Sequence, residues 1–259
     1  MSIITLTTDF GQKGYYLAVL KGTILRADPE LQIVDISHHV KPYDIVQGAY
    51  ILKNAFRHFP EGTIHLACVD NLSSSPSLIA FEQDGHFFIG PDNGIFSLMF
   101  GHVPKEVFRL DIDKKNPFPL NGAMAKAAAH LAAGKPLFEI GLPAGETERR
   151  IALQPVISTS QIRGSVIYID HFENAIVNIS HELFEKTRNK RRFKLFFKRH
   201  DPITQLSRCY HDVAIGETLC LFNDAGYLTI AINMGKAASL LGLKLGDMVQ
   251  VDFVGKMRV

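Results

Sequence analysis

Acidic side chains stand at the ends of two strands predicted in the first half of the chain. Asp9 follows an apolar strand in the segment IITLTTDFG at 3–11, and Asp70 follows the strand predicted over Thr63–Val69. The carboxyl ends of parallel strands meet at one edge of a sheet, where α/β proteins hold small ligands. We therefore expect Asp9 and Asp70 to face a common crevice, in which a carboxylate can accept hydrogen bonds from a ribose diol.

Two chemistries fit such carboxylates. They could bind a hard metal ion together with Asp92 and either His38 or His39, or they could bind a polar or cationic organic ligand directly. The sequence contains no HExxH, GxSxG or P-loop motif. A metal site would therefore depend on convergence alone, and we predict no metal centre. A lone aspartate also often caps a turn.

The second half offers another polar loop, Asp170-His171-Phe172-Glu173-Asn174, between two predicted strands. Asp170 and Asn174 could present an acceptor and an amide to a ligand, with Phe172 as an apolar wall. Alternatively, the loop is of the Asx type and its side chains satisfy its own backbone. Tyr210, just before a predicted strand, could stack on a base or be a half-buried aromatic residue.

Composition restricts the class of protein. The chain has 259 residues, of which 46% are hydrophobic and 21% charged, as in ordinary globular domains. No apolar run reaches the roughly 18–20 residues that cross a bilayer, and no secretory signal precedes the first strand. The three cysteines have no CxxC spacing and are typical of small apolar residues in strands. We expect a cytoplasmic protein with no membrane partner.

The net charge of +2 conceals a basic segment at 185–200, which holds eight Lys and Arg residues and one Glu. Such a run could contact nucleic acid. We favour a solvated hairpin that packs Phe193, Leu195 and Phe197 on one face, because nucleic-acid binders spread basic charge more widely. Nucleic acid is therefore not an expected partner.

The first half alternates strands and helices. Strands are predicted at Ile3–Leu6, Ile33–Ile36, Thr63–Val69, Leu78–Phe81 and His86–Ile89, and helices after Gly11, after the capping residue Asp44 and over Ala123–Ala133. The Asp84-Gly85 pair predicts a tight turn between the last two strands. This alternation is typical of an α/β domain with a mostly parallel sheet, which we place at 1–150.

The second half contains short strands separated by turns. They are predicted at Ser165–Ile169, Ala175–Ile179, Arg192–Phe197, Thr218–Phe222, Tyr227–Ile232 and Met248–Phe253. Only Lys236–Leu241 has a helical pattern, and the polar segment Gly141–Arg163 predicts a linker. Residues 151–259 are therefore expected to form an antiparallel β-barrel domain.

Several longer motifs occur in order along the whole chain. They are IITLTTDFG at 3–11, VDISH at 34–38, PYDIVQGAYIL at 42–52, FPEGTIHLACVD at 59–70, GPDNG at 90–94, AAAHLAAG at 127–134 and GYLTIAIN at 226–233. In these motifs the chain resembles the S-adenosyl-L-methionine (SAM) hydroxide adenosyltransferases, relatives of the SAM-dependent fluorinases and chlorinases.

The resemblance implies a function and an assembly. Enzymes of that family attack C5′ of the ribose of SAM and release methionine, and water as the nucleophile gives adenosine. It also implies a homotrimer that binds SAM between the first domain of one subunit and the second domain of its neighbour, with SAM as the substrate and no cofactor. The site residues that it implies are Asp70 as the catalytic group and Asp9, Phe10, Asp170, Phe172, Asn174, Tyr210 and Ala237 as substrate-binding groups.

The chain departs from the family pattern at four positions. Ser77 and Pro119 replace the catalytic arginine and histidine, Glu173 replaces a glycine, and Asp224 replaces a serine that helps to receive the methionine carboxylate. We favour hydrolysis of SAM to adenosine and L-methionine with Asp70 orienting the water. The alternative is a non-catalytic protein that binds SAM or adenosine.

Overall fold

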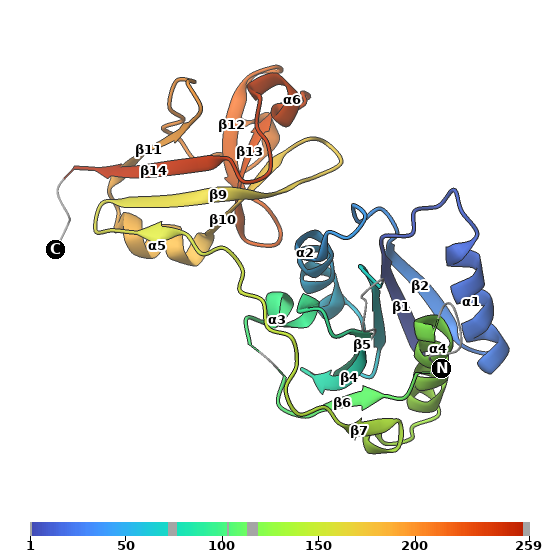
Figure 1. Ribbon diagram of the computed structural model, residues 1–259. Helices are drawn as coiled ribbons and strands as arrows, with labels where there is room; N and C mark the ends of the chain where they lie inside the picture. Colours follow the sequence, from blue (N-terminus) through green and yellow to red (C-terminus); the bar gives the residue numbers. More distant parts are fainter. Residues whose placement is uncertain (1, 72–76, 103, 113–118, 256–259) are drawn as a thin grey trace. The chain divides into compact units, whose positions relative to one another are not determined.

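The computed structural model describes residues 2–71, 77–102, 104–112 and 119–255. The chain divides into two compact units, residues 1–152 and 153–259, each with a sheet of its own (Figure 1). The first unit contains β1 (Ile3–Thr8), α1 (Tyr16–Ala27), β2 (Gln32–Ser37), α2 (Ile45–Ala55), β3 (Ile64–Cys68), β4 (Leu78–Gln83), β5 (His86–Pro91), α3 (Ile95–Phe100), β6 (Val107–Leu110), α4 (Pro119–Ala132) and β7 (Gly141–Pro143).

The sheet of the first unit has the order β2-β1-β3-β5-β4-β6-β7. Strand β1 pairs in parallel with β2 and β3, and β3 pairs in parallel with β5. Strand β6 runs in the same direction, while β4 and β7 run in the opposite one. The predicted α/β domain with a mostly parallel sheet is therefore confirmed. Asp84 and Gly85, with φ of 53° and 76°, form the predicted turn between β4 and β5.

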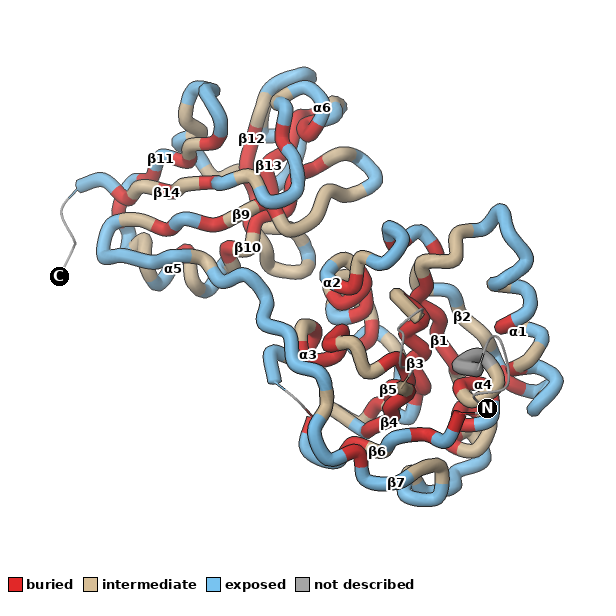
Figure 2. Tube along the Cα trace, viewed as in Figure 1, coloured by how far each residue is buried: buried red, intermediate tan, exposed pale blue. Residues whose placement is uncertain are grey.

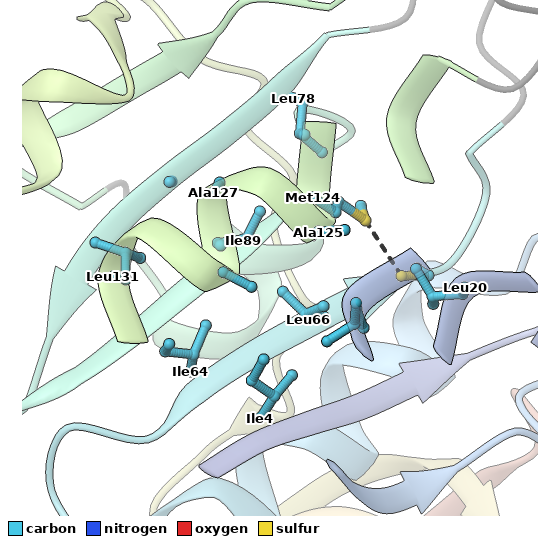
Figure 3. Close-up of a cluster of buried hydrophobic side chains, with 14 of the residues drawn as sticks. Ile4, Leu20, Ile64, Leu66, Leu78, Ile89, Met124, Ala125, Ala127 and Leu131 are labelled. Atoms are coloured by element: carbon cyan, nitrogen blue, oxygen red, sulfur yellow. Dashed lines mark hydrogen bonds between the residues drawn. The ribbon is translucent and has the colours of Figure 1, made fainter. Parts of the chain in front are cut away.

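Helices cover both faces of this sheet. On one face α1 and α4 pack against the strands, so that Ile4, Leu20 and Met124 share one buried core (Figure 3). On the other face α2 and α3 enclose a second core that includes Leu52 and Phe88. Figure 2 shows buried residues concentrated on the strands between these layers. A sheet covered on both faces explains why inner strands such as β1 and β3 are buried at successive residues, with no alternation of buried and exposed positions.

Two buried imidazoles are hydrogen-bonded on the α2 side of the sheet. Oγ1 of Thr5 lies 2.6 Å from Nδ1 of His65, and Nε2 of His65 lies 3.2 Å from Nδ1 of His86. The rings of Phe56 and Phe88 lie 6.0 Å and 5.0 Å from the His65 ring. Desolvation, with a smaller repulsion from His86, lowers the pKa of His65 to about 3. His65 is therefore neutral in the folded protein at neutral pH.

The second unit is built from antiparallel strands. It contains β8 (Val156–Ile157), β9 (Gln161–Ile169), β10 (Ala175–Ser180), α5 (His181–Arg188), β11 (Arg192–Phe197), β12 (Thr218–Phe222), β13 (Tyr227–Ile232), α6 (Ala237–Leu241) and β14 (Met248–Val254). The strand order is β11-β14-β9-β10-β13-β12, and β8 pairs with β9. This antiparallel half-barrel confirms the predicted class of the second domain. Within the described ranges, no helix is both long and apolar enough to span a membrane.

Two predictions for the second half need correction. The linker is shorter than Gly141–Arg163, because β7 pairs with β6 at its start and β9 includes its last three residues. The basic segment 185–200 is not a hairpin, since it comprises the end of helix α5 followed by β11, which pairs with β14. The expected burial of Phe193, Leu195 and Phe197 is correct.

Helix α5 escaped prediction because it has almost no apolar pattern. Phe184 is its only buried residue. The helix begins with a cap in which the side chain of Ser180 accepts a hydrogen bond from the N–H of Leu183 at 3.2 Å. Leu183 and Phe184 are the only apolar residues among the eight of this helix, and they leave the periodicity too weak to detect.

The low pKa of His65 predicts that stability depends on pH. An unfolded chain binds a proton at this residue near pH 6.5, whereas the folded protein resists protonation until about pH 3. Between these values the free energy of unfolding should fall by about 1.4 kcal/mol for each unit of decrease in pH on account of this group alone. Above pH 6.5 the stabilisation should be complete.

Urea unfolding across this pH range measures the slope, and His65→Gln is the matched variant. Glutamine keeps hydrogen-bonding groups at the position but does not titrate, so the variant should have a flatter profile. An equally steep profile in the variant would assign the dependence to other groups.

Candidate active site

Asp9 joins the ends of β1 and β3 through its carboxylate. Its Oδ2 accepts hydrogen bonds from the backbone N–H groups of Tyr43 at 2.9 Å and of Asp70 at 3.2 Å. Tyr43 and Asp70 have φ of 67° and 54°, a region that residues other than glycine seldom adopt. The carboxylate therefore stabilises two unusual backbone positions. The structure brings Asp9 and Asp70 together.

Asn93 binds the backbone carbonyl groups that follow β3. Its Nδ2 donates to the carbonyl oxygens of Val69 at 3.0 Å and Asp70 at 3.4 Å, and its Oδ1 accepts from the N–H of Ile95 at 3.2 Å. Asn93 thus connects the end of β3 to the start of α3. Reasoning from the sequence did not single it out, although an asparagine between a strand and a helix is a known signal for side chain to backbone bonding.

A chain of polar groups lies behind this corner. Oγ1 of Thr8 lies 3.0 Å from Nδ1 of His38, and Nε2 of His38 lies 3.1 Å from Oδ1 of Asp35. Lys21 Nζ completes the chain at 2.6 Å from Oδ2 of Asp35. Partial burial acts to raise the pKa of Asp35, but hydrogen bonds from Lys21 and His38 outweigh it and lower that pKa. The Nδ1 of His38 is therefore hydrogen-bonded to Thr8, while its Nε2 faces the Asp35 carboxylate at ion-pair distance.

Asp92 is engaged elsewhere. Its Oδ2 lies 3.0 Å from Nη2 of Arg109, and its Oδ1 accepts a hydrogen bond from the N–H of Glu148 at 2.8 Å. Asp92 was considered as a metal ligand, but its two bonds hold the last segment of the first unit in place. Nowhere in the described part of the chain do three or more His, Cys, Asp or Glu side chains form a group that could hold a metal ion.

Aromatic residues occur in the segments next to Asp9. Phe10 is half-buried, packs against the first core and has its ring 6.3 Å from that of Tyr16. The Tyr15 ring follows at 4.7 Å from Tyr16, and Tyr15 and Tyr43 are largely exposed. These rings offer flat apolar surface beside a carboxylate, which suits a ligand that is part aromatic and part polar.

The two positions that depart from the catalytic pattern are only partly described. Residues 72–76 of the serine-rich segment NLSSSPS at 71–77, which ends at Ser77, lie outside the described residues. At its end, the carbonyl oxygen of Ser77 accepts a hydrogen bond from the N–H of Asp92 at 2.9 Å. Pro119 is the first residue of α4.

In the second unit, Asp170 and Asn174 bond to each other. Asp170 Oδ1 accepts from the N–H of Asn174 at 2.8 Å, and Oδ2 accepts from its Nδ2 at 2.9 Å. The N–H of Asp170 donates in return to the Asn174 carbonyl at 3.1 Å. The structure thus has the Asx-type loop considered as the alternative, in which side chains satisfy the loop itself. The loop leaves Phe172 72% exposed.

Tyr210 and Ala237 lie near this loop. Tyr210 is 39% exposed, and partial burial with the nearby carboxylates of Asp170 and Asp224 raises its pKa. It lies in a 3₁₀ turn, Tyr210–Asp212, ahead of β12, which begins at Thr218 as predicted. Ala237 starts α6 and is fully buried.

The order of these elements matches known proteins. Residues 4–141 match the model of the SAM hydroxide adenosyltransferase N-terminal domain, and residues 164–250 match that of the C-terminal domain. The chain belongs to the SAM hydroxide adenosyltransferase family. The (R)-S-adenosyl-L-methionine hydrolases of Methanocaldococcus jannaschii and Salinispora tropica are 29% and 30% identical to this family member, over 98% and 96% of its length and 97% of theirs.

More distant and structural relatives agree with this placement. A protein named fluorinase from Actinoplanes is 27% identical over 96% of this adenosyltransferase-family chain and 97% of its own. A conserved protein from Thermotoga maritima has a similar structure, with a TM-score of 0.85 and 29% identity over 97% of this chain and 100% of its own. A conserved hypothetical protein from Thermus thermophilus gives a TM-score of 0.74 at 29% identity, over 98% of this chain and 100% of its own.

The contacts of Asp9 predict a role in stability. Asp9→Ala removes the acceptor for two backbone N–H groups at positions of positive φ. The free energy of unfolding should fall by about 1–3 kcal/mol, the cost of leaving partly buried donors without a partner. Asp9→Asn keeps one oxygen acceptor and should cost less. Urea unfolding of both variants measures the difference, and equal stability of Asp9→Ala and the wild type would contradict this role.

Proposed function

We propose that this protein hydrolyses SAM to adenosine and L-methionine. Water attacks C5′ of the ribose, the C5′–S bond breaks with its electron pair moving to sulfur, and the water gives up a proton. The sulfonium leaves as a neutral thioether, so no general acid is required. The observation that carries the proposal is the hydrogen bond between the Asp9 carboxylate and the N–H of Asp70, which joins the ends of β1 and β3 in a chain whose full-length relatives include named SAM hydrolases.

Each carboxylate has a distinct task in this proposal. Asp9 accepts hydrogen bonds from the ribose hydroxyls with Phe10 beside it, and Asp70 orients the attacking water and accepts its proton. Alignment of a desolvated water with the C5′–S bond supplies most of the acceleration, because proximity and orientation can be worth several kcal/mol. The negative field of the two carboxylates also favours a cationic substrate. No cofactor is assigned, since SAM itself is the substrate.

The second unit would hold the other parts of the substrate. Asp170 and Asn174 contact the methionine portion, Phe172 and Tyr210 supply aromatic surface, and the backbone at Ala237 meets the adenine edge. In the proposed homotrimer, each site combines the first unit of one subunit with the second unit of its neighbour. We further propose that the protein works in the cytoplasm.

A second candidate function is binding without catalysis. Ser77 and Pro119 stand where the family pattern has an arginine and a histidine, so Asp70 would act on water without those partners. A binding protein should retain SAM or adenosine and release no methionine over hours. Incubation of the purified protein with SAM, followed by mass spectrometry of the nucleoside products, separates the two candidates. Activity that disappears in a chelator would instead indicate a metal-dependent reaction.

Replacement of Asp70 tests the catalytic assignment. Asp70→Asn keeps the size of the side chain but removes the charge that accepts the proton of water. Adenosine release should fall to background, whereas the affinity for SAM, measured by calorimetry, should stay close to that of the wild type. Unchanged turnover would remove Asp70 from the mechanism.

Replacement of Asp9 tests ribose binding. Asp9→Ala should weaken adenosine binding by about 1–3 kcal/mol through the loss of charged hydrogen bonds to the sugar. Titrations belong at a temperature at which circular dichroism shows the variant to be folded. Adenosine that binds the variant as tightly as the wild type would rule out contact between Asp9 and the ribose.

A further inference from the structure

The side chain of Glu173 connects two segments of the second unit that are far apart in the sequence. Its Oε2 accepts hydrogen bonds from the hydroxyl of Ser239 and from the Ser239 N–H at 3.1 Å. Its Oε1 lies 3.1 Å from Nζ of Lys236. The backbone carbonyl of Glu173 accepts a further bond from the N–H of Ala238 at 2.8 Å. One residue of the β9–β10 loop thus caps the first turn of α6 (Figure 1).

The backbone of Glu173 is unusual in the same way as that of Asp70. It has φ of 63°, which glycine adopts freely and a side chain disfavours. A glutamate at this position therefore costs conformational energy that a glycine would not. The hydrogen bonds from Ser239 act against this conformational cost. They also lower the pKa of the Glu173 carboxyl, with a smaller effect from Lys236. The side chain is 24% exposed, so its charge is only partly screened by solvent.

The two segments that Glu173 joins are those assigned to the substrate. Asp170 and Asn174 lie on either side of it in the loop, and Ala237 begins the helix that it caps. We propose that Glu173 is a positioning residue, which fixes the distance between the loop that takes the methionine portion and the helix start that meets the adenine. This inference rests on the proposed function of the site. Glu173 itself acts through its neighbours and does not contact the substrate.

Two replacements separate this role from a backbone effect. Glu173→Gly relieves the positive φ and removes the link, so its Tm should equal or exceed that of Glu173→Ala. Both variants should nevertheless raise the Kd for SAM by about 5- to 10-fold, the size expected when one charge-assisted hydrogen bond ceases to organise a site. The kcat should change less than the KM, because Asp70 and the water are untouched.

Glu173→Gln serves as the conservative variant and Glu217→Ala as the control. Glutamine retains an acceptor for Ser239 and should restore most of the affinity, whereas replacement of the exposed Glu217 should leave affinity unchanged. Ser239→Ala, introduced into the wild type, should cause part of the loss of affinity for SAM seen in Glu173→Ala. Introduced into Glu173→Ala, it should weaken binding little further, since both substitutions break the same contact.

Hydrogen exchange provides a measurement that does not need substrate. The amide of Ser239 donates to the Glu173 carboxylate, so it should exchange faster in Glu173→Gly, whereas the amide of Ala238, which donates to the backbone carbonyl that glycine keeps, and the amides of β13 should change less. If the wild type binds SAM and Glu173→Gly binds it equally well, the positioning role is wrong and the proposed function stands. If the wild type neither binds nor cleaves SAM, the proposed function fails and the positioning role fails with it. Unchanged exchange at the Ser239 amide would overturn the side-chain link itself.

Discussion

The conformation of the first unit at the ends of its strands depends on a single carboxylate that follows β1. Asp9 accepts the N–H groups of Tyr43 and Asp70, and these residues come from separate connections of the sheet. Without an acceptor, two donors at strained positions would be left in a partly buried corner. The same hydrogen bonds therefore set the geometry of the candidate site and stabilise the ends of the strands. Asn93 and the Thr8–His38 pair complete the corner.

The second unit also uses carboxylates to hold an irregular segment of the chain in place. The Asp170 carboxylate closes its loop on Asn174, and the Glu173 carboxylate fastens that loop to α6. Both units thus use acidic side chains as acceptors for backbone N–H groups where irregular chain must be held in one conformation. A carboxylate used in this way is rigid before any ligand arrives, and preorganised groups lose less entropy on binding.

The sequence predicts most of the framework because the framework obeys periodic rules. The strands, the Asp44 cap and the Asp84-Gly85 turn follow from apolar spacing and local residue chemistry, and the pairing of Asp9 with Asp70 follows from parallel topology. Helix α5 was missed because only Phe184 is buried on it. The bond between Asp92 and Arg109 was not predicted, because Arg109 lies on β6 and a contact between distant segments leaves no local pattern. Tyr43 gave no signal, since a positive φ at a tyrosine is imposed by tertiary contacts.

The pairing of β1 on both sides has an evolutionary consequence. Thr8 is aligned with Cys68 on β3, and the neighbouring Thr7 with Ser37 on β2. An insertion or deletion anywhere in β1 would turn its apolar residues to the wrong face and carry Asp9 away from its two donors in one step. Relatives can therefore change the lengths of their surface connections freely, but we expect the residue count of this one strand to be invariant among descendants that keep the site.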